Sequence, residues 1–134
     1  MNLYIDIEIF NKEFYSKLLI AMESASKGIN VYMGRLKPYL LRDFFVPGIV
    51  LLKSITPSAA RLSELNYYKK KNIIVTSLDE EVGLVNPNNE YLVSRYSNES
   101  VELTDRVFTW GKFDYENLKH KFKKYKKKII LSGN

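Results

Sequence analysis

Short apolar runs alternate with longer amphipathic stretches along most of the chain. Short runs are typical of strands buried on both faces, and the longer stretches have the 3.6-residue period of helices. Taken in chain order, the apolar runs cover residues 3–7, 29–33, 48–52, 72–76, 106–109 and 127–131. This alternation predicts an α/β fold with about six parallel strands, because each parallel crossover needs a connecting helix.

The amphipathic stretches predict the helices that connect these strands. They cover residues 11–27, 36–44, a stretch that Thr56-Pro57 begins, 90–103, and a stretch that Asp114 begins. Apolar residues recur at helical spacing in the first stretch, and its predicted apolar face consists of Phe14, Leu18, Ala21, Met22 and Ala25. Helices and strands together predict a single Rossmann-like three-layer domain over residues 1–134.

Composition and missing motifs narrow the class of protein. The chain has no cysteine, which excludes disulfides and thiolate metal sites and favours a reducing cytoplasm. Neither GxGxxG nor a Walker loop is present, so no phosphate-binding loop of either type is encoded. The one histidine, His120, lies among lysines and is predicted to face solvent, which excludes a metal site of histidine type. A magnesium site built from carboxylates stays open, but no motif supports it, so no metal site is expected. The longest apolar run, 44–52, is interrupted by Pro47-Gly48 and is too short to span a bilayer.

Positive charge is concentrated near the end of the chain. The net charge is +6, and the segment KHKFKKYKKK at 119–128 holds seven of the 21 basic residues. The segment suits a phosphate-bearing partner such as an anionic membrane surface or nucleic acid, but it is equally the pattern of a solvated helix face. No helix-turn-helix, RRM or zinc pattern accompanies it, so no nucleic-acid partner is expected.

Polar residues at the strand ends are the candidate site. In open parallel sheets ligands bind beyond the carboxyl ends of the strands. That rule selects Asp6 and Glu8, Arg35, Lys53 and Ser54, Asp79 to Glu81, Trp110-Gly111, and Ser132 to Asn134. Several are polar where the preceding strand is apolar, so the chemistry is predicted to lie along one edge of the sheet.

These residue types suggest sugar chemistry. Glu80 and Glu81 are the predicted catalytic residues, since a carboxylate at a strand end can take a proton from an attacking hydroxyl. The predicted substrate-binding residues are Glu8, Arg35, Lys53, Asp79, Trp110 and Gly111; the cations would face an acidic or phosphorylated group, and Trp110 would stack on a sugar ring. The alternatives are that the acids cap a helix or form ion pairs, and that Trp110 belongs to the core.

Several short motifs resemble one family. They are Asp79-Glu80-Glu81-x-Gly83, Asp105-x-Val-Phe-x-Trp110-Gly111, Leu131-Ser132-Gly133-Asn134, Lys17-Leu18-Leu19-Ile20-Ala21 with Lys27-Gly28, and Lys53-Ser-Ile-Thr-Pro57. Together they resemble the bacterial surface carbohydrate biosynthesis proteins, which are similar to two-lobed GT-B glycosyltransferases and, in architecture, to CDP-glycerol glycerophosphotransferases. Val82 is a departure, because the family pattern is Asp-Glu-Glu-Gly without it.

The resemblance implies a division of labour between two lobes. It implies that residues 1–134 form the N-terminal lobe, which mainly binds a sugar or lipid-linked glycan acceptor. The nucleotide-activated donor would bind a C-terminal lobe outside these residues, so no cofactor is expected here. The implied location is the cytoplasm, at the inner face of the membrane if the lysines contact lipid.

Two other classes stay open on the sequence. A flavodoxin-like module that binds a small ligand or a protein would have the same alternation of strands and helices. A receiver domain is disfavoured, because the third strand ends in Leu52-Lys53 rather than an aspartate. A nucleic-acid-binding α/β domain would use the lysine-rich segment and would bind with a steep dependence on salt.

Overall fold

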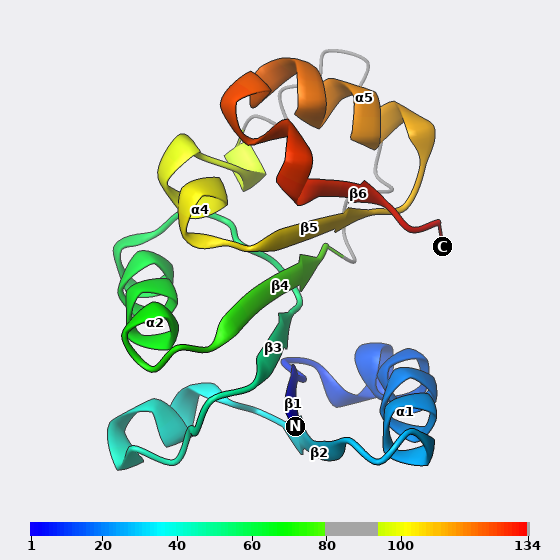
Figure 1. Ribbon diagram of the computed structural model, residues 1–134, viewed down its shortest axis with the longest axis vertical. Helices are drawn as coiled ribbons and strands as arrows, with labels where there is room; N and C mark the ends of the chain where they lie inside the picture. Colours follow the sequence, from blue (N-terminus) through cyan, green and yellow to red (C-terminus); the bar gives the residue numbers. More distant parts are fainter. Residues whose placement is uncertain (80–93, 134) are drawn as a thin grey trace.

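The computed structural model describes residues 1–79 and 94–133, which form one parallel β-sheet with helices on both faces (Figure 1). The strand order is β2-β1-β3-β4-β5-β6, and every neighbouring pair is parallel. The strands are β1 (Asn2–Asp6), β2 (Asn30–Gly34), β3 (Ile49–Leu52), β4 (Ile74–Leu78), β5 (Arg106–Thr109) and β6 (Ile129–Leu131). The predicted α/β class with six parallel strands is confirmed, with strand bounds shifted by two residues at most.

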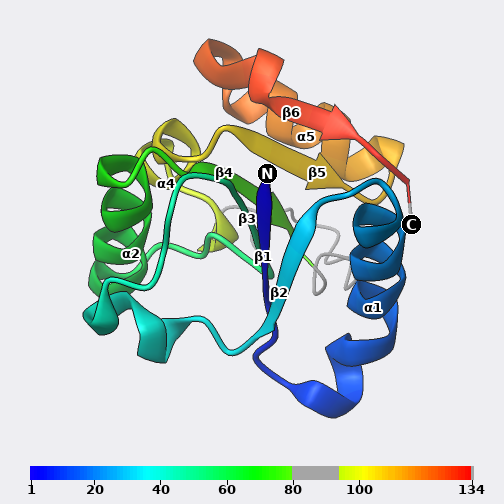
Figure 2. The same cartoon turned by 60° about the horizontal axis from the view of Figure 1, so that its bottom comes forward.

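Helices cover the two faces unequally, as Figure 2 shows. The helices are α1 (Phe10–Ser26), the 3₁₀ helix η1 (Lys37–Arg42), α2 (Ala59–Lys70), α4 (Asn98–Leu103), α5 (Lys112–Lys121) and the 3₁₀ helix η2 (Lys123–Lys128). Of these, α1 packs on one face, while α2, α4 and α5 pack on the other. The arrangement is a Rossmann-like three-layer fold.

The residues of β3 show why the central strands are continuously apolar. Val50 and Leu52 are fully buried in the larger core cluster, together with residues of α2, α4 and α5. Leu51 points to the opposite face and packs in the smaller cluster with Ala21 of α1. Because successive side chains of a strand alternate between faces, a strand covered on both sides needs apolar residues at every position.

The sheet reverses its direction of winding between β1 and β3. β2 lies on one side of β1 and β3 on the other, after which the remaining strands follow in chain order. This is the order of flavodoxin-like sheets with a sixth strand added. In such sheets the crevice for a ligand forms beyond the carboxyl ends of the two strands at the reversal.

The predicted apolar face of α1 is wrong in part. Glu13, Lys17 and Ala21 are the buried residues of this helix, whereas Met22 is 61% exposed and Ala25 is exposed. The reason is that the Glu13–Lys17 ion pair, whose residues lie one helical turn apart, is on the buried side of the helix. The helix is therefore rotated from the orientation that its apolar residues predict. Hydrophobic periodicity cannot detect this, because it counts every charged residue as outward-facing.

Three smaller departures concern the other helices. The segment predicted as a helix at 36–44 forms the tighter 3₁₀ helix η1, with Pro38 in its first turn. The N-cap of α2 is Ser58, whose hydroxyl accepts a hydrogen bond from the Arg61 N–H, and not Thr56. The last helix begins at Lys112, and Asp114 lies in its first turn. Of the helices predicted over 90–103, the structure describes α4; residues 90–93 lie outside the described part.

Candidate functional site

A cluster of charged side chains lies beneath the loop that joins β1 to α1. The Lys17 ammonium donates to the Glu13 carboxylate at 2.7 Å and to the carbonyl of Asp6, the last residue of β1, at 2.6 Å. The Lys53 ammonium, just beyond β3, lies 3.0 Å from the Glu8 carboxylate and 3.3 Å from that of Glu13. Two lysines and one glutamate of this cluster are buried, so each charge depends on its partners for stabilisation.

Glu13 also accepts hydrogen bonds from backbone N–H groups at the N-terminus of its own helix. Its two carboxylate oxygens accept hydrogen bonds from the backbone N–H groups of Glu8 and Ile9, each at 3.0 Å. Burial alone would raise the pKa of Glu13, but the hydrogen bonds from Lys17 and from these N–H groups bring its pKa below the ordinary value. Dinucleotide-binding folds place a pyrophosphate at the start of their first helix. Here a carboxylate of the chain itself occupies that position.

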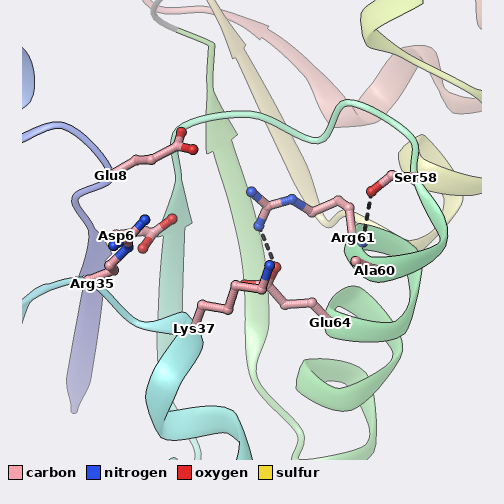
Figure 3. A pocket seen from close by; sticks show the side chains of 8 residues that line it. All are labelled: Asp6, Glu8, Arg35, Lys37, Ser58, Ala60, Arg61 and Glu64. Carbon is pink, nitrogen blue, oxygen red and sulfur yellow. Dashed lines mark hydrogen bonds and ion pairs between the residues drawn. The ribbon is translucent and has the colours of Figure 1, made fainter.

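A cleft of about 170 Å³ opens next to this cluster, at the point where the sheet reverses. Its lining residues are Asp6, Glu8, Arg35, Lys37, Ser58, Ala60, Arg61 and Glu64. In Figure 3, Asp6, Glu8 and Arg35 approach from the ends of β1 and β2, while Ser58, Arg61 and Glu64 approach from α2. The volume is below the roughly 300–1,000 Å³ of pockets for drug-sized ligands, so it suits a ligand of about the size of one sugar unit.

Two buried carboxyl groups belong to this cleft. Asp6 accepts a hydrogen bond from the Leu36 N–H at 3.1 Å, and burial raises its pKa. Glu64 accepts one from the Tyr68 hydroxyl at 3.1 Å and pairs with Arg61 at 2.6 Å. Burial raises the pKa of Glu64, and the charge of Asp6 adds to that rise. Carboxyls with a raised pKa in a cleft are candidate proton acceptors or donors.

The cations of the cleft come from three elements. Arg35 follows β2, Lys37 begins η1, and Arg61 lies in the first turn of α2. The start of α2 adds the positive end of a helix dipole on the same side. With three cations and three carboxylates, the formal charge of the lining is zero. The cleft therefore favours a ligand with both hydroxyl groups and an anionic group over a simple anion.

A second, smaller cavity, too narrow to hold a water molecule, lies at the ends of β4 and β5. Its lining includes Asp79, Trp110 and Asp114. The Asp79 carboxylate is fully buried and forms two hydrogen bonds of 2.5 Å with the Arg95 guanidinium. Burial raises the pKa of Asp114, and the nearby charge of Asp79 raises it further.

The structure separates the predicted site residues into two groups. Glu8 and Arg35 line the larger cleft, and Lys53 borders it through its ion pair with Glu8. Asp79 and Trp110 line the smaller cavity, next to Gly111, which is the N-cap of α5. The predicted catalytic residues, Glu80 and Glu81, lie outside the described residues.

The sequence did not predict five of the eight lining residues of the larger cleft. It did not select Lys37, Ser58, Arg61 or Glu64, because none of them ends a strand. For the residues at the start of α2, the signal in the sequence is the serine N-cap, Ser58. A serine N-cap soon after a buried strand places the first turn of a helix at the carboxyl edge of the sheet.

No family model, no curated protein and no solved structure matches the chain. None of the helices in the described part of the chain is long and apolar enough to cross a membrane. The geometry of the cleft therefore carries the functional argument.

Proposed function

We propose that this domain binds the acceptor in a glycosyltransferase of bacterial surface carbohydrate synthesis, with a sugar or glycan that carries an anionic group in the larger cleft. The observation that supports this most is the alternation of carboxylates with guanidinium and ammonium groups around one small cleft. Carboxylates accept hydrogen bonds from sugar hydroxyls, while Arg side chains bind phosphates and carboxylates in a bidentate manner. The position of the cleft at the reversal of the sheet supports the same proposal.

Within the cleft, we assign the anionic group of the ligand to the side formed by Arg61, Lys37 and the start of α2. The hydroxyl groups would face Asp6 and Glu8. A carboxyl with a raised pKa can act as a general base closer to neutral pH than an ordinary one. Asp6 and Glu64 thus join Glu80 and Glu81 as candidates for the group that takes the attacking proton.

An NMR titration of the 134-residue protein tests the proposal. Glucose 1-phosphate serves as the probe, and glucose and inorganic phosphate are titrated separately. Shifts should be confined to the cleft and should be larger for the sugar phosphate than for either part alone. Arg61→Gln should weaken binding about tenfold or more, because it removes a charge-assisted contact. Arg42→Gln, at an exposed position of η1 outside the lining, is the matched control and should not change binding.

Two results of this titration would contradict the proposal. One is binding that moves residues of the smaller cavity and leaves those of the larger cleft unchanged. The other is equal weakening in both arginine variants, which would indicate a general charge effect. On this proposal the protein works in the cytoplasm, which the absence of cysteine supports.

A flavodoxin-like module without catalysis is the second candidate, and the strand order β2-β1-β3-β4-β5 favours it. The two candidates differ in their expected response to nucleotides. An acceptor lobe should show no calorimetric binding of nucleotide sugars at millimolar concentration, since Glu13 occupies the start of α1. Tight stoichiometric binding of any nucleotide would contradict the division between lobes and favour the module.

A further inference from the structure

We propose that the lysine tract, residues 119–128, docks this domain onto an anionic phospholipid surface. The tract holds seven lysines while the whole chain has a net charge of +6, so all other residues together carry a net charge of −1. The protein therefore has one positive pole and an otherwise nearly neutral body. Such a pole orients a protein toward a negative surface before any specific contact forms.

The structure separates two lysines of the tract that donate to backbone carbonyls of the domain from the exposed lysines of η2. Lys128 donates to the carbonyls of Val101, Glu102 and Thr104 at the end of α4, at 3.2, 2.5 and 2.7 Å. Lys121 lies 3.4 Å from the Tyr96 carbonyl. Burial lowers the pKa of both ammonium groups. These two lysines stabilise the fold and are not counted as part of the docking surface.

Four lysines of η2 remain exposed, and they form the proposed docking surface: Lys123, Lys124, Lys126 and Lys127. Lys124 has an acidic neighbour, Glu102, at 4.0 Å, with both side chains more than half exposed. A pair of that kind is weak in water and leaves the lysine available to a phosphate. In Figure 1, η2 is the orange-to-red segment between α5 and β6.

The aromatic residues of the tract favour lipid over nucleic acid as the partner. Phe122 is buried in the core, and the Tyr125 hydroxyl donates to the Glu102 carboxylate at 2.9 Å. Neither ring is presented for stacking on a base, which single-stranded nucleic-acid sites use. A six-residue 3₁₀ helix spans about 12 Å at its rise of roughly 2 Å per residue. Positive charge over this length can contact several lipid headgroups at once.

The docking surface and the cleft lie at opposite edges of the sheet. η2 leads directly into β6, so it lies at the amino edge, whereas the cleft lies at the carboxyl edge beyond β1 and β2. A domain held by η2 would turn its cleft toward the aqueous phase. The docking proposal is therefore independent of the proposed ligand, and the two can fail separately.

Vesicle flotation with the 134-residue protein tests the proposal. The probes are phosphatidylcholine vesicles with about a third phosphatidylglycerol, and phosphatidylcholine vesicles alone. The protein should float with the first and not the second, and a rise in salt beyond about 0.15 M should release it. Reversal of three lysines, Lys123→Glu/Lys126→Glu/Lys127→Glu, should lower partitioning by at least about a hundredfold, because the loss of each lysine alone costs roughly fivefold and each new glutamate is repelled by the lipid.

The matched control reverses three exposed cations elsewhere, Lys12→Glu/Arg42→Glu/Lys112→Glu, and changes the net charge equally. It should retain most of the partitioning, and thermal unfolding should show that both variants are folded. A milder variant, Lys123→Gln/Lys126→Gln/Lys127→Gln, replaces the first one if charge reversal prevents folding. Equal loss in tract and control variants would overturn the proposal. So would equal binding to neutral vesicles, or binding of labelled RNA or DNA without binding of anionic vesicles.

Discussion

At the carboxyl edge of the sheet the charged side chains are mostly paired and partly buried, whereas at the amino edge the lysines of η2 are mostly exposed. The residues that line the cleft at the carboxyl edge have a formal charge of zero in sum. The seven lysines of the tract carry more positive charge than the net +6 of the whole chain. The comparison shows that charge density along a sequence does not locate a small-ligand site. Burial and pairing determine which charges are held in place to recognise a ligand and which only attract a surface.

The same contrast occurs within a single helix. α1 and its C-cap residue, Lys27, hold two Glu–Lys pairs with the same spacing and the same distance of 2.7 Å, Glu13–Lys17 and Glu23–Lys27. The side chains of the first pair are 2% and 4% exposed, and those of the second 68% and 66%. Geometry and sequence spacing are thus matched, whereas burial differs and Glu13 has further partners in Lys53 and two backbone N–H groups.

The largest expected effect comes from breaking the buried pair. Glu13→Gln removes the charge that balances Lys17 and Lys53 and weakens the acceptor of two backbone N–H groups. Loss of one partner of a buried ion pair costs about 3–5 kcal/mol. Urea unfolding at neutral pH should show a loss of that size in the free energy of unfolding.

Glu23→Gln is the control on the same helix. Its partner Lys27 is exposed and stays solvated after the change, so no measurable loss of stability is expected. If both variants lost the same free energy of unfolding, burial would not determine how much such a pair contributes, and the contrast between the two edges would fail. The same pair should make stability depend on pH. The stability contributed by Glu13 is present above its ordinary pKa and is lost as pH falls through its lowered folded pKa.

A second, smaller loss of stability should distinguish a lysine of the tract that binds backbone carbonyls from one that is exposed. Lys128→Met removes three hydrogen bonds to the last carbonyls of α4 while retaining most of the aliphatic chain. The expected loss is about 1–3 kcal/mol in the free energy of unfolding, since the carbonyls of Val101 and Thr104, both buried residues, lose this donor. Lys127→Met, at the adjacent exposed position, should leave stability unchanged and should weaken only binding to anionic vesicles. The reverse order of the two variants in urea unfolding would contradict the assignment.

The sheet could be predicted from sequence because its signal is local. The run from Ile49 to Leu52 alternates between two buried faces, and only continuous apolar residues satisfy both. The order of the strands was predicted only as that of a Rossmann-like lobe, because the exact order, β2-β1-β3-β4-β5-β6, depends on which side of β1 each crossover leads the chain. The place of the cleft follows from that order.

The candidate site could be predicted only where it lies at a strand end. Glu8, Arg35 and Lys53 were selected in this way, and the structure brings them together. Arg61 and Glu64 were missed because a pair three residues apart on a helix has the same pattern as an exposed surface pair. Nothing in the residue types distinguishes the two situations, since burial arises from packing of α2 against the sheet.

The smallest expected effect concerns Glu64, and it has the opposite sign to that of Glu13. Because burial and the charge of Asp6 raise the pKa of Glu64, the folded state keeps this proton to a higher pH than the unfolded state. The free energy of unfolding should therefore fall as pH rises above the ordinary carboxyl pKa, until the raised folded value is passed. Arg61, Lys37 and the Tyr68 hydroxyl oppose the rise in the pKa of Glu64, and the raised pKa of Asp6 adds a similar pH dependence of its own.

Glu64→Gln should remove the part of this pH dependence that comes from Glu64, about 1.4 kcal/mol for each unit by which the folded pKa exceeds the ordinary one. Urea unfolding of wild type and variant across the acidic to neutral range measures the difference, which should grow in favour of the variant as pH rises. Glu116→Gln, at an exposed position of α5, should give a curve parallel to that of the wild type. A Glu64→Gln curve that is also parallel, or one that falls more steeply with pH, would show that this carboxyl is paired and solvated like those at the surface.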